Sequence, residues 1–171
     1  MKHFLSLLVL LFVVGCTAVK DNRKPTFGIV IHGGAGTILK ENMSTKMEQA
    51  YREKLAEAVA TGHAILKAGG TSQDAVEQTI HVMENSPLFN SGKGAVLTAD
   101  ESIALDASFM DGKTLDAGAI AGVKHIKNPI SAAIKVMNNS PHVMLAGVGA
   151  DQFAVEQGLD TVPESYFITE R

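Results

Sequence analysis

The chain has 171 residues, of which 46% are hydrophobic and 19% are charged, and its formal net charge is −3. This composition is typical of a globular protein with a sizeable core, and it excludes a disordered chain. The small negative charge argues against nucleic acid or anionic lipid as a partner. The lack of tryptophan and the low aromatic content also argue against a base-stacking surface.

The amino terminus has the pattern of an export signal. A basic start at Lys2 precedes residues 4–14, which are almost wholly apolar. That run is too short for a membrane anchor, which needs about 20 residues, but it suits a signal peptide. The sole cysteine, Cys16, follows Val-Val-Gly and resembles the lipidated residue of a bacterial lipoprotein processing site. Ordinary signal-peptide cleavage nearby, with Cys16 incidental, is the alternative.

These features divide the chain into three parts. Residues 1–15 are predicted to be a lipoprotein-type signal peptide, residues 16–26 a polar tether, and residues 27–171 the folded portion. We therefore expect an exported protein in the periplasm or at the cell surface. Only the lipid on Cys16 would attach it to a membrane.

The first half of the folded portion is predicted to hold a strand and two helices. The apolar run 27–31 predicts a buried strand, followed by a glycine-rich loop. Ser44 or Thr45 is suited to cap a helix that ends near residue 67, before a glycine pair. Thr71, with an acid three residues later, predicts the capping box of a second helix, which stops before Pro87.

The second half mixes strands and helices. Asn128 is predicted to cap a helix that opens with Pro129, and Asp111-Gly112 is a turn signal between strands. The expected strands are 95–98, 103–110, 114–123 and 142–146, and the expected helices are 128–138 and 149–156. This order is not strict βαβ alternation. It indicates an α/β or α+β domain with helices outside a largely antiparallel sheet.

Three motifs occur together in this portion. They are His-Gly-Gly-Ala-Gly at 32–36, Leu-Phe-Asn-Ser-Gly-Lys-Gly-Ala-Val-Leu-Thr at 88–98, and Asp-Ala-Ser-Phe-Met-Asp-Gly at 106–112. As a set they resemble the plant-type L-asparaginase/isoaspartyl peptidase family of N-terminal nucleophile (Ntn) hydrolases, from about residue 27 to residue 155. The resemblance implies a four-layer αββα sandwich of which this chain is the N-terminal half.

The resemblance also implies a threonine amidohydrolase that acts on a small amino acid or dipeptide, namely L-asparagine or β-aspartyl (isoaspartyl) dipeptides. In that family the nucleophile is a threonine that self-cleavage turns into an N-terminus, and it would lie beyond Arg171. This chain would then be an α-subunit, inactive alone. Its partner would be the C-terminal β-subunit of the same precursor in an (αβ)2 assembly, with no cofactor for catalysis. A non-catalytic surface lipoprotein that keeps the fold as a binding or scaffold module is the alternative.

No catalytic residue is assigned to this chain, but three residues are expected to support the site. The resemblance implies that Asn90 faces the catalytic threonine. Its side-chain amide can both donate and accept hydrogen bonds, so it could orient a hydroxyl or an amine there. The residue type alone leaves a turn asparagine open. Gly33 and Gly34 are candidates for a backbone element beside the site, or simply for a sharp turn.

The loop of residues 83–94 is rich in glycine and poor in charge, so its carbonyl groups need partners. A cation, other backbone groups or water could supply them, because hard cations take oxygen ligands. The resemblance implies a structural sodium ion held by the main-chain carbonyls of Met83, Glu84, Ser86, Phe89, Ser91 and Lys93.

Other polar residues are expected to be structural. An N-terminal threonine hydrolase uses its own α-amine as base, so His32 is predicted to make a structural hydrogen bond. Asp106 and Asp111 point to opposite faces of a strand and do not form a catalytic pair. Asp106, on an apolar strand, needs a partner of its own. The histidines have no spacing suited to zinc.

Overall fold

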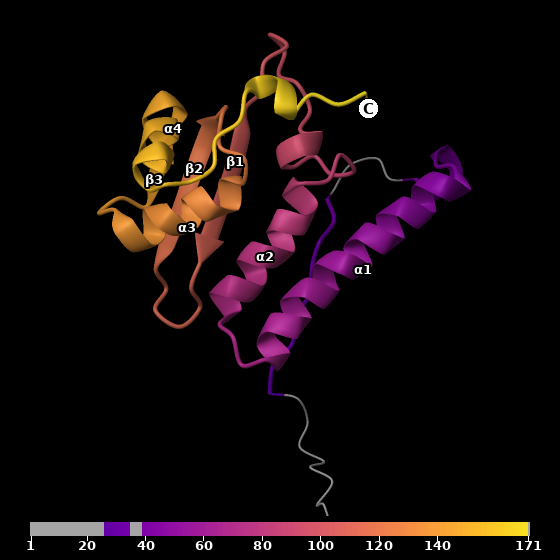
Figure 1. The fold of residues 1–171 in the computed structure, drawn as a ribbon, viewed down its shortest axis with the longest axis horizontal. Helices are drawn as coiled ribbons and strands as arrows, with labels where there is room; N and C mark the ends of the chain where they lie inside the picture. Colours follow the sequence, from indigo (N-terminus) through magenta and orange to yellow (C-terminus); the bar gives the residue numbers. More distant parts are fainter. Residues whose placement is uncertain (1–25, 35–38, 171) are drawn as a thin grey trace, which may run out of the picture.

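The computed structural model describes residues 26–34 and 39–170 (Figure 1). Cys16 and the predicted signal peptide lie outside these residues. The helices and strands, in chain order, are α1 (Thr45–Lys67), α2 (Ser72–Glu84), β1 (Leu105–Met110), β2 (Ala117–Val123), α3 (Pro129–Asn139), β3 (Met144–Ala146) and α4 (Gly147–Glu156). Short 3-10 turns occupy Lys40–Asn42, Gly92–Gly94 and Glu164–Tyr166. Within the described ranges, no helix is both long and apolar enough to cross a membrane.

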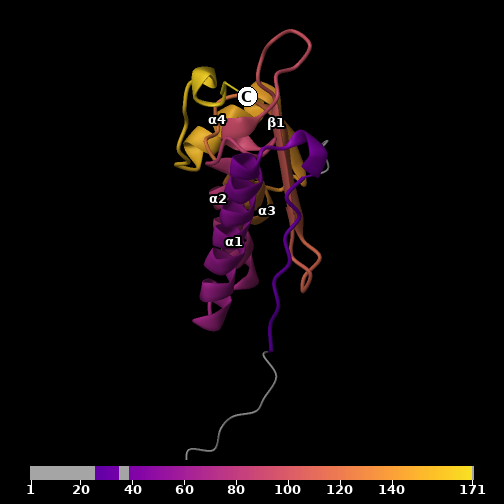
Figure 2. The same ribbon diagram turned by 90° about the vertical axis from the view of Figure 1, so that its right-hand side faces the viewer.

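The strands form a three-stranded sheet in the order β1-β2-β3. β1 and β2 pair antiparallel, whereas β2 and β3 pair parallel, with α3 as the crossover. Figure 2 shows the helices gathered on one side of the strand layer. The expected mixed α/β architecture is confirmed, although the sheet pairing is mixed rather than largely antiparallel. The main core lies between the helices and the face of the sheet that they cover. Its members include Leu105, Ile120, Val123, Ala132, Val136, Ala150 and Ala154.

Helix α3 lies directly against β2 because β2 carries a glycine at the contact. A Cβ atom on Gly118 would lie 2.1 Å from the Ala133 carbonyl oxygen and 2.4 Å from the Met137 amide nitrogen. Any side chain at Gly118 would therefore push the helix off the sheet. This contact fixes the distance between the two layers.

The opposite face of the sheet is bare in the described part of the chain. Met110 on β1 is 59% exposed, and Asp106 and Ser108 on the same face are also exposed. Met144, on β3, is exposed as well. In a layered domain, a sheet packs other elements against its apolar faces. Here the helices cover one face of the sheet, and the described residues leave the other face open.

Both predicted helix caps in the first half are confirmed. The Ser44 hydroxyl accepts a hydrogen bond from the Met47 amide at 3.2 Å and starts α1. The Thr71 hydroxyl accepts from the Asp74 amide at 3.0 Å and starts α2. The two helices then pack side by side (Figure 1).

Two predicted strands are wrong. Residues 27–31 and 95–98 have no strand assignment, because no neighbouring strand among the described residues pairs with either segment. Residues 27–31 nevertheless keep the alternation of half-buried and exposed side chains that an extended chain shows, and Val30 is 93% exposed. The half-buried side chains face α1. The Phe27 ring, for example, lies 5.4 Å from the ring of His63 on α1, measured between centroids.

The predicted turn between β1 and β2 is confirmed. The Leu115 amide donates to the Asp111 carbonyl oxygen at 2.8 Å, and the Asp111 side chain accepts from the Lys113 amide at 2.7 Å. Asp106 finds its partner in the same hairpin, where its carboxylate accepts from the Gly122 amide at 2.8 Å. The pairing register shifts at this point, so Asp106 stabilises a β-bulge.

Candidate active site

The Asn90 loop begins where α2 ends, and a buried aromatic ring anchors it. Phe89 packs edge-on against Tyr51 of α1, with ring centroids 5.8 Å apart. Asn90 itself is exposed, and its side-chain oxygen accepts a hydrogen bond from the Val96 amide at 2.9 Å. Because the oxygen is engaged, the part of this amide suited to act on another group is its NH2, a hydrogen-bond donor.

Gly33 lies beside the same anchor. A Cβ atom at Gly33 would lie 3.0 Å from the Leu55 side chain and 3.7 Å from the Phe89 ring. The structure therefore brings Gly33 next to the Asn90 loop, in contact with the Phe89 ring. Gly34 has φ +118°, and its amide donates to His32 Nδ1 at 3.3 Å. The predicted structural hydrogen bond of His32 is confirmed.

Two glycines of the predicted sodium loop allow carbonyl groups of the same loop to approach closely. A Cβ atom at Gly92 would lie 2.4 Å from the Glu84 carbonyl oxygen, and one at Gly94 would lie 2.1 Å from the Phe89 carbonyl oxygen. Two of the expected ligand oxygens thus pack closely against positions that only glycine can occupy. The Met83 carbonyl accepts from the Ser86 amide at 3.0 Å. Carbonyl oxygens in a closed loop are a donor set that fits an alkali cation.

The side chain of Glu84 is the feature that sequence reasoning missed. It is 2% exposed, and its carboxylate accepts hydrogen bonds from the Ile130 amide and the Asn128 side-chain amide, both at 3.0 Å. Burial raises the pKa of Glu84 to about 7, although these two hydrogen bonds act in the opposite direction. No local pattern signals this contact, since it joins residues 46 positions apart.

This contact corrects the role predicted for Asn128. Asn128 stands at the N-cap position of α3, but its side chain makes no cap hydrogen bond to the helix. Its amide instead donates to Glu84 and, at 3.3 Å, to the Asn85 side chain. The first turn of α3 is capped by a carboxylate from α2, because Glu84 reaches the amide of Ile130 directly.

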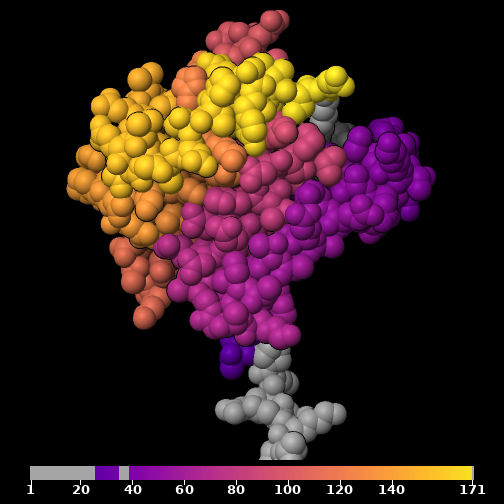
Figure 3. Space-filling view, viewed as in Figure 1, coloured from indigo at the N-terminus to yellow at the C-terminus, as the bar shows by residue number. Residues whose placement is uncertain are grey.

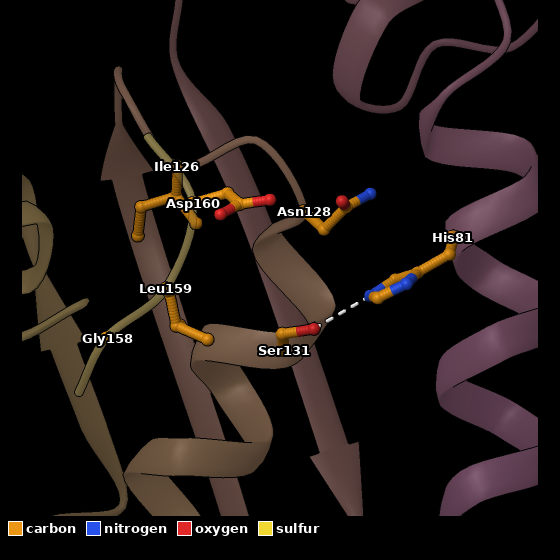
Figure 4. Close-up of a pocket in the computed structure, with 7 residues that line it drawn as sticks. All are labelled: His81, Ile126, Asn128, Ser131, Gly158, Leu159 and Asp160. Atoms are coloured by element: carbon orange, nitrogen blue, oxygen red, sulfur yellow. Dashed lines mark hydrogen bonds between the residues drawn. The ribbon is translucent and has the colours of Figure 1, made fainter. Parts of the chain in front are cut away.

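A cavity of about 260 Å³ lies between α2, α3 and the segment after α4 (Figure 4). There the Ser131 hydroxyl donates to Glu77 at 2.6 Å, and His81 Nε2 lies 2.7 Å from the same hydroxyl oxygen. Burial lowers the pKa of His81, and Glu77 opposes this shift. Since the hydroxyl proton goes to the carboxylate, the imidazole is the donor to Ser131. The group joins two helices and is not arranged to activate a serine nucleophile.

Metal-binding side chains do not gather in the part of the chain that the structure describes. There, no group of three or more His, Cys, Asp or Glu residues could hold a metal ion.

The chain is similar in sequence to proteins of known function. The profile of the family described as Asparaginase matches residues 24–171. The chain is 49% identical over 141 residues to the isoaspartyl peptidase of Escherichia coli (strain K12), covering 82% of the chain and 44% of the relative. It is 46% identical over 143 residues to the isoaspartyl peptidase/L-asparaginase of Mus musculus, covering 84% and 43%.

A third relative is the plant-type L-asparaginase of Pyrococcus furiosus, 52% identical over 126 residues, which are 74% of the chain and 40% of the relative. The chain thus spans less than half the length of these curated relatives. The family profile and the relatives carry the same conclusion as the three sequence motifs. The chain belongs to the asparaginase family of Ntn hydrolases, of which it represents an N-terminal portion.

Proposed function

We propose that this chain is the α-subunit part of an autoprocessing threonine hydrolase that cleaves the side-chain amide of L-asparagine and the isopeptide bond of β-aspartyl dipeptides. The observation that carries the proposal is the match to isoaspartyl peptidases and plant-type L-asparaginases over their N-terminal two fifths. The nucleophile and the clamps for the substrate's α-amine and α-carboxylate belong to the C-terminal part.

The chemistry follows from an N-terminal threonine. Its hydroxyl oxygen attacks the amide carbon, while its own α-amine takes the hydroxyl proton. The C–N bond then breaks, the nitrogen receives that proton, and ammonia or the α-amine of the second amino acid leaves. Water hydrolyses the resulting ester to L-aspartate and restores the threonine. Asn90 contributes its NH2 group, which donates to the threonine and orients it.

The shape of this chain supports a C-terminal partner. Within residues 26–34 and 39–170, the face of the sheet that carries Met110 and Met144 is open, and residues 26–34 lie in the strand layer without a strand neighbour (Figure 2). A second sheet on the open face and a strand beside residues 27–31 would complete four layers. This supports an αβ unit, and we extend the proposal to its pairing as (αβ)2.

A structural sodium ion is part of the proposal. The carbonyls of Met83, Glu84, Ser86, Phe89, Ser91 and Lys93 would hold it, and the ion would keep the Asn90 loop closed. A ligand that binds only the folded state stabilises it by mass action. The melting temperature of the complete protein should rise more with sodium than with tetramethylammonium at equal ionic strength. Equal melting temperatures in the two salts would overturn the ion site.

The proposed location is the outer side of the cytoplasmic membrane or the cell surface, through a lipid on Cys16. The mature N-terminus would then be Cys16, and mass spectrometry of that peptide would detect the acyl chains. Cys16→Ala should block processing or move the protein to the soluble fraction. Unchanged membrane partitioning of Cys16→Ala would rule out the anchor.

The activity is tested on the complete protein expressed from its full reading frame. We expect release of ammonia from L-asparagine and of free amino acids from β-aspartyl dipeptides, and none from the 171-residue chain alone. Changing the threonine at the self-cleavage site to alanine is the matched control, because it keeps the fold and removes the nucleophile. A complete, cleaved protein that hydrolyses neither substrate would refute the proposal.

A further inference from the structure

Glu84 is a buried carboxylate to which the proposed mechanism gives no role beyond its main-chain carbonyl. Its side chain lies at the one point where α2 ends, α3 begins and the Asn90 loop starts. The Ile130 amide and the Asn128 side chain both donate to it at 3.0 Å. We propose that the Glu84 side chain is a positioning residue, which holds the Asn90 loop against α3 and so sets the place of the Asn90 amide.

The backbone of Glu84 lies directly under the glycine turn of that loop. A Cβ atom at Gly92 would meet the Glu84 carbonyl oxygen at 2.4 Å and the Glu84 Cβ at 2.9 Å. Gly92 also has φ +56°, a conformation that side chains other than glycine adopt with strain. Movement of Glu84 would therefore move Gly92, which follows Asn90 by two residues.

The same carboxylate belongs to a chain of contacts that fastens the other end of the loop. The Asn128 amide also donates to the Asn85 side-chain oxygen at 3.3 Å, and the Tyr166 hydroxyl donates to that oxygen at 3.4 Å. The Lys93 ammonium lies 5.4 Å from the centre of the Tyr166 ring. The C-terminal segment, yellow in Figure 3, accordingly lies against the end of α2.

These contacts close a ring around the loop that carries Asn90. Glu84 holds the start of the loop, Lys93 holds its far side, and Asn128 connects the two through Asn85 and Tyr166. A carboxylate between two donors in a buried place has one favoured orientation, so the ring is stiff at its Glu84 end. A displacement of about 1 Å in a catalytic group lowers rates by roughly 100-fold, which makes such stiffness functional.

The inference rests on the proposed function for the meaning of Asn90, and its test separates the two. The complete protein would be prepared with saturating sodium as wild type, Glu84→Ala, Glu84→Gln and Asn128→Ala. Glu77→Ala is the matched control, because Glu77 also joins α2 to α3, through Ser131 at 2.6 Å, but two turns away from the loop. Hydrogen exchange of residues 86–96 and the steady-state constants for L-asparagine are measured for each.

Glu84→Ala should raise exchange at the Val96 amide, which Asn90 holds, and lower kcat by roughly 10- to 100-fold with KM within about threefold. Glu84→Gln keeps an acceptor for Ile130 and should restore kcat to within about threefold of wild type. Glu77→Ala should leave both the loop exchange and kcat unchanged. If Glu84→Ala does not fold, Asn128→Ala, which keeps the cap on α3, should still raise exchange in the loop.

Loop exchange in the Glu84 and Asn128 variants equal to that of wild type would overturn the inference. An equal response in Glu77→Ala would also overturn it, because general helix packing would then explain the effect. If the exchange contrast appears in a protein without hydrolytic activity, the proposed function fails and the positioning role stands.

Discussion

Helices α1 and α3 differ in how much of their surface is buried. The 11 residues of α3 are mostly buried, including Ile130, Ala133 and Val136, because the sheet lies on one side and α2 on another. The 23 residues of α1 include only Ala58 and Gly62 as buried positions. The part of the chain around α3 therefore has a core of its own. The part around α1 has apolar positions that the described residues do not cover.

The two regions therefore differ in how complete their packing is. The α3 region forms the rigid base, with Gly118 and the main core at its centre. The α1 region, with residues 26–34 and the Asn90 loop, and the open face of the sheet are the parts that the proposed C-terminal partner completes. The following predictions concern the complete protein and test this division.

The largest effect is expected at the covered face. Gly118→Ala would place a methyl group 2.1 Å from a backbone oxygen that cannot move without shifting α3. We expect a loss of about 3 kcal/mol or more in unfolding free energy, measured by urea denaturation. Gly149→Ala is the control, because a Cβ atom there meets nothing within 4 Å. A loss below about 1 kcal/mol for Gly118→Ala would mean that the two layers are not tightly packed.

The second effect concerns Glu84, which joins the two regions. Its folded-state pKa of about 7 lies above the ordinary value of 4.5, so the folded state holds the proton more tightly. The stability that this group contributes is full below pH 4.5 and is lost as the pH rises through 7, by about 3 kcal/mol in all.

The pH effect is measured as the difference in unfolding free energy between wild type and Glu84→Gln, at pH 5 and pH 8, in tetramethylammonium salts. Sodium in the adjacent loop would favour the ionised carboxylate and should reduce the difference. A difference that does not change with pH would show that the Glu84 carboxyl ionises in the folded protein as it does in the unfolded chain.

A smaller effect distinguishes the open face of the sheet from the outer side of α4. Met110 is 59% exposed and Val148 is 83% exposed in this chain, so both look like surface residues. If a second sheet covers Met110, Met110→Ser should lower the stability of the complete protein by about 1–2 kcal/mol. Val148→Ser should cost less than about 0.5 kcal/mol. Equal small costs would argue against a second sheet at this face.

The smallest effect is expected at the start of α1. Ser44→Ala removes the hydroxyl that accepts from the Met47 amide at 3.2 Å and should cost about 1 kcal/mol. Ser44→Asp keeps an acceptor and should restore the stability. Thermal denaturation measures both variants. An unchanged melting temperature for Ser44→Ala would mean that contacts with the partner, and not the cap, hold this end of α1.

Local patterns predicted the features that depend on a few neighbouring residues. The caps at Ser44 and Thr71 and the turn at Asp111 rely on contacts within four positions, and all three are confirmed. Residues 27–31 and 95–98 have the composition of strands, but a strand also needs a hydrogen-bonded neighbour. That neighbour is not encoded in the segment itself, so those two predictions are wrong.

The candidate site shows the same limit. The motif around Asn90 identified the loop, and its glycine content indicated carbonyl groups that need partners. The roles of Asn128 and Glu84 could not be predicted, because each depends on a partner more than 40 positions away. The identity of Asn128 predicted a side-chain cap of its own helix. The structure gives that task to α2.

The cap that α2 supplies to α3 has a consequence for how the chain assembles. A helix with its own N-cap side chain can complete its first turn alone, whereas α3 receives the acceptor for its Ile130 amide only after α2 has docked. The two helices should therefore gain their final stability in a single cooperative step. During synthesis, about 46 residues must be added after Glu84 before Ile130, whose amide donates to it, is present. A chain interrupted within that interval would leave Val76 and Ile80 of α2 without the α3 side chains that cover them, and exposed apolar surface of this kind favours aggregation.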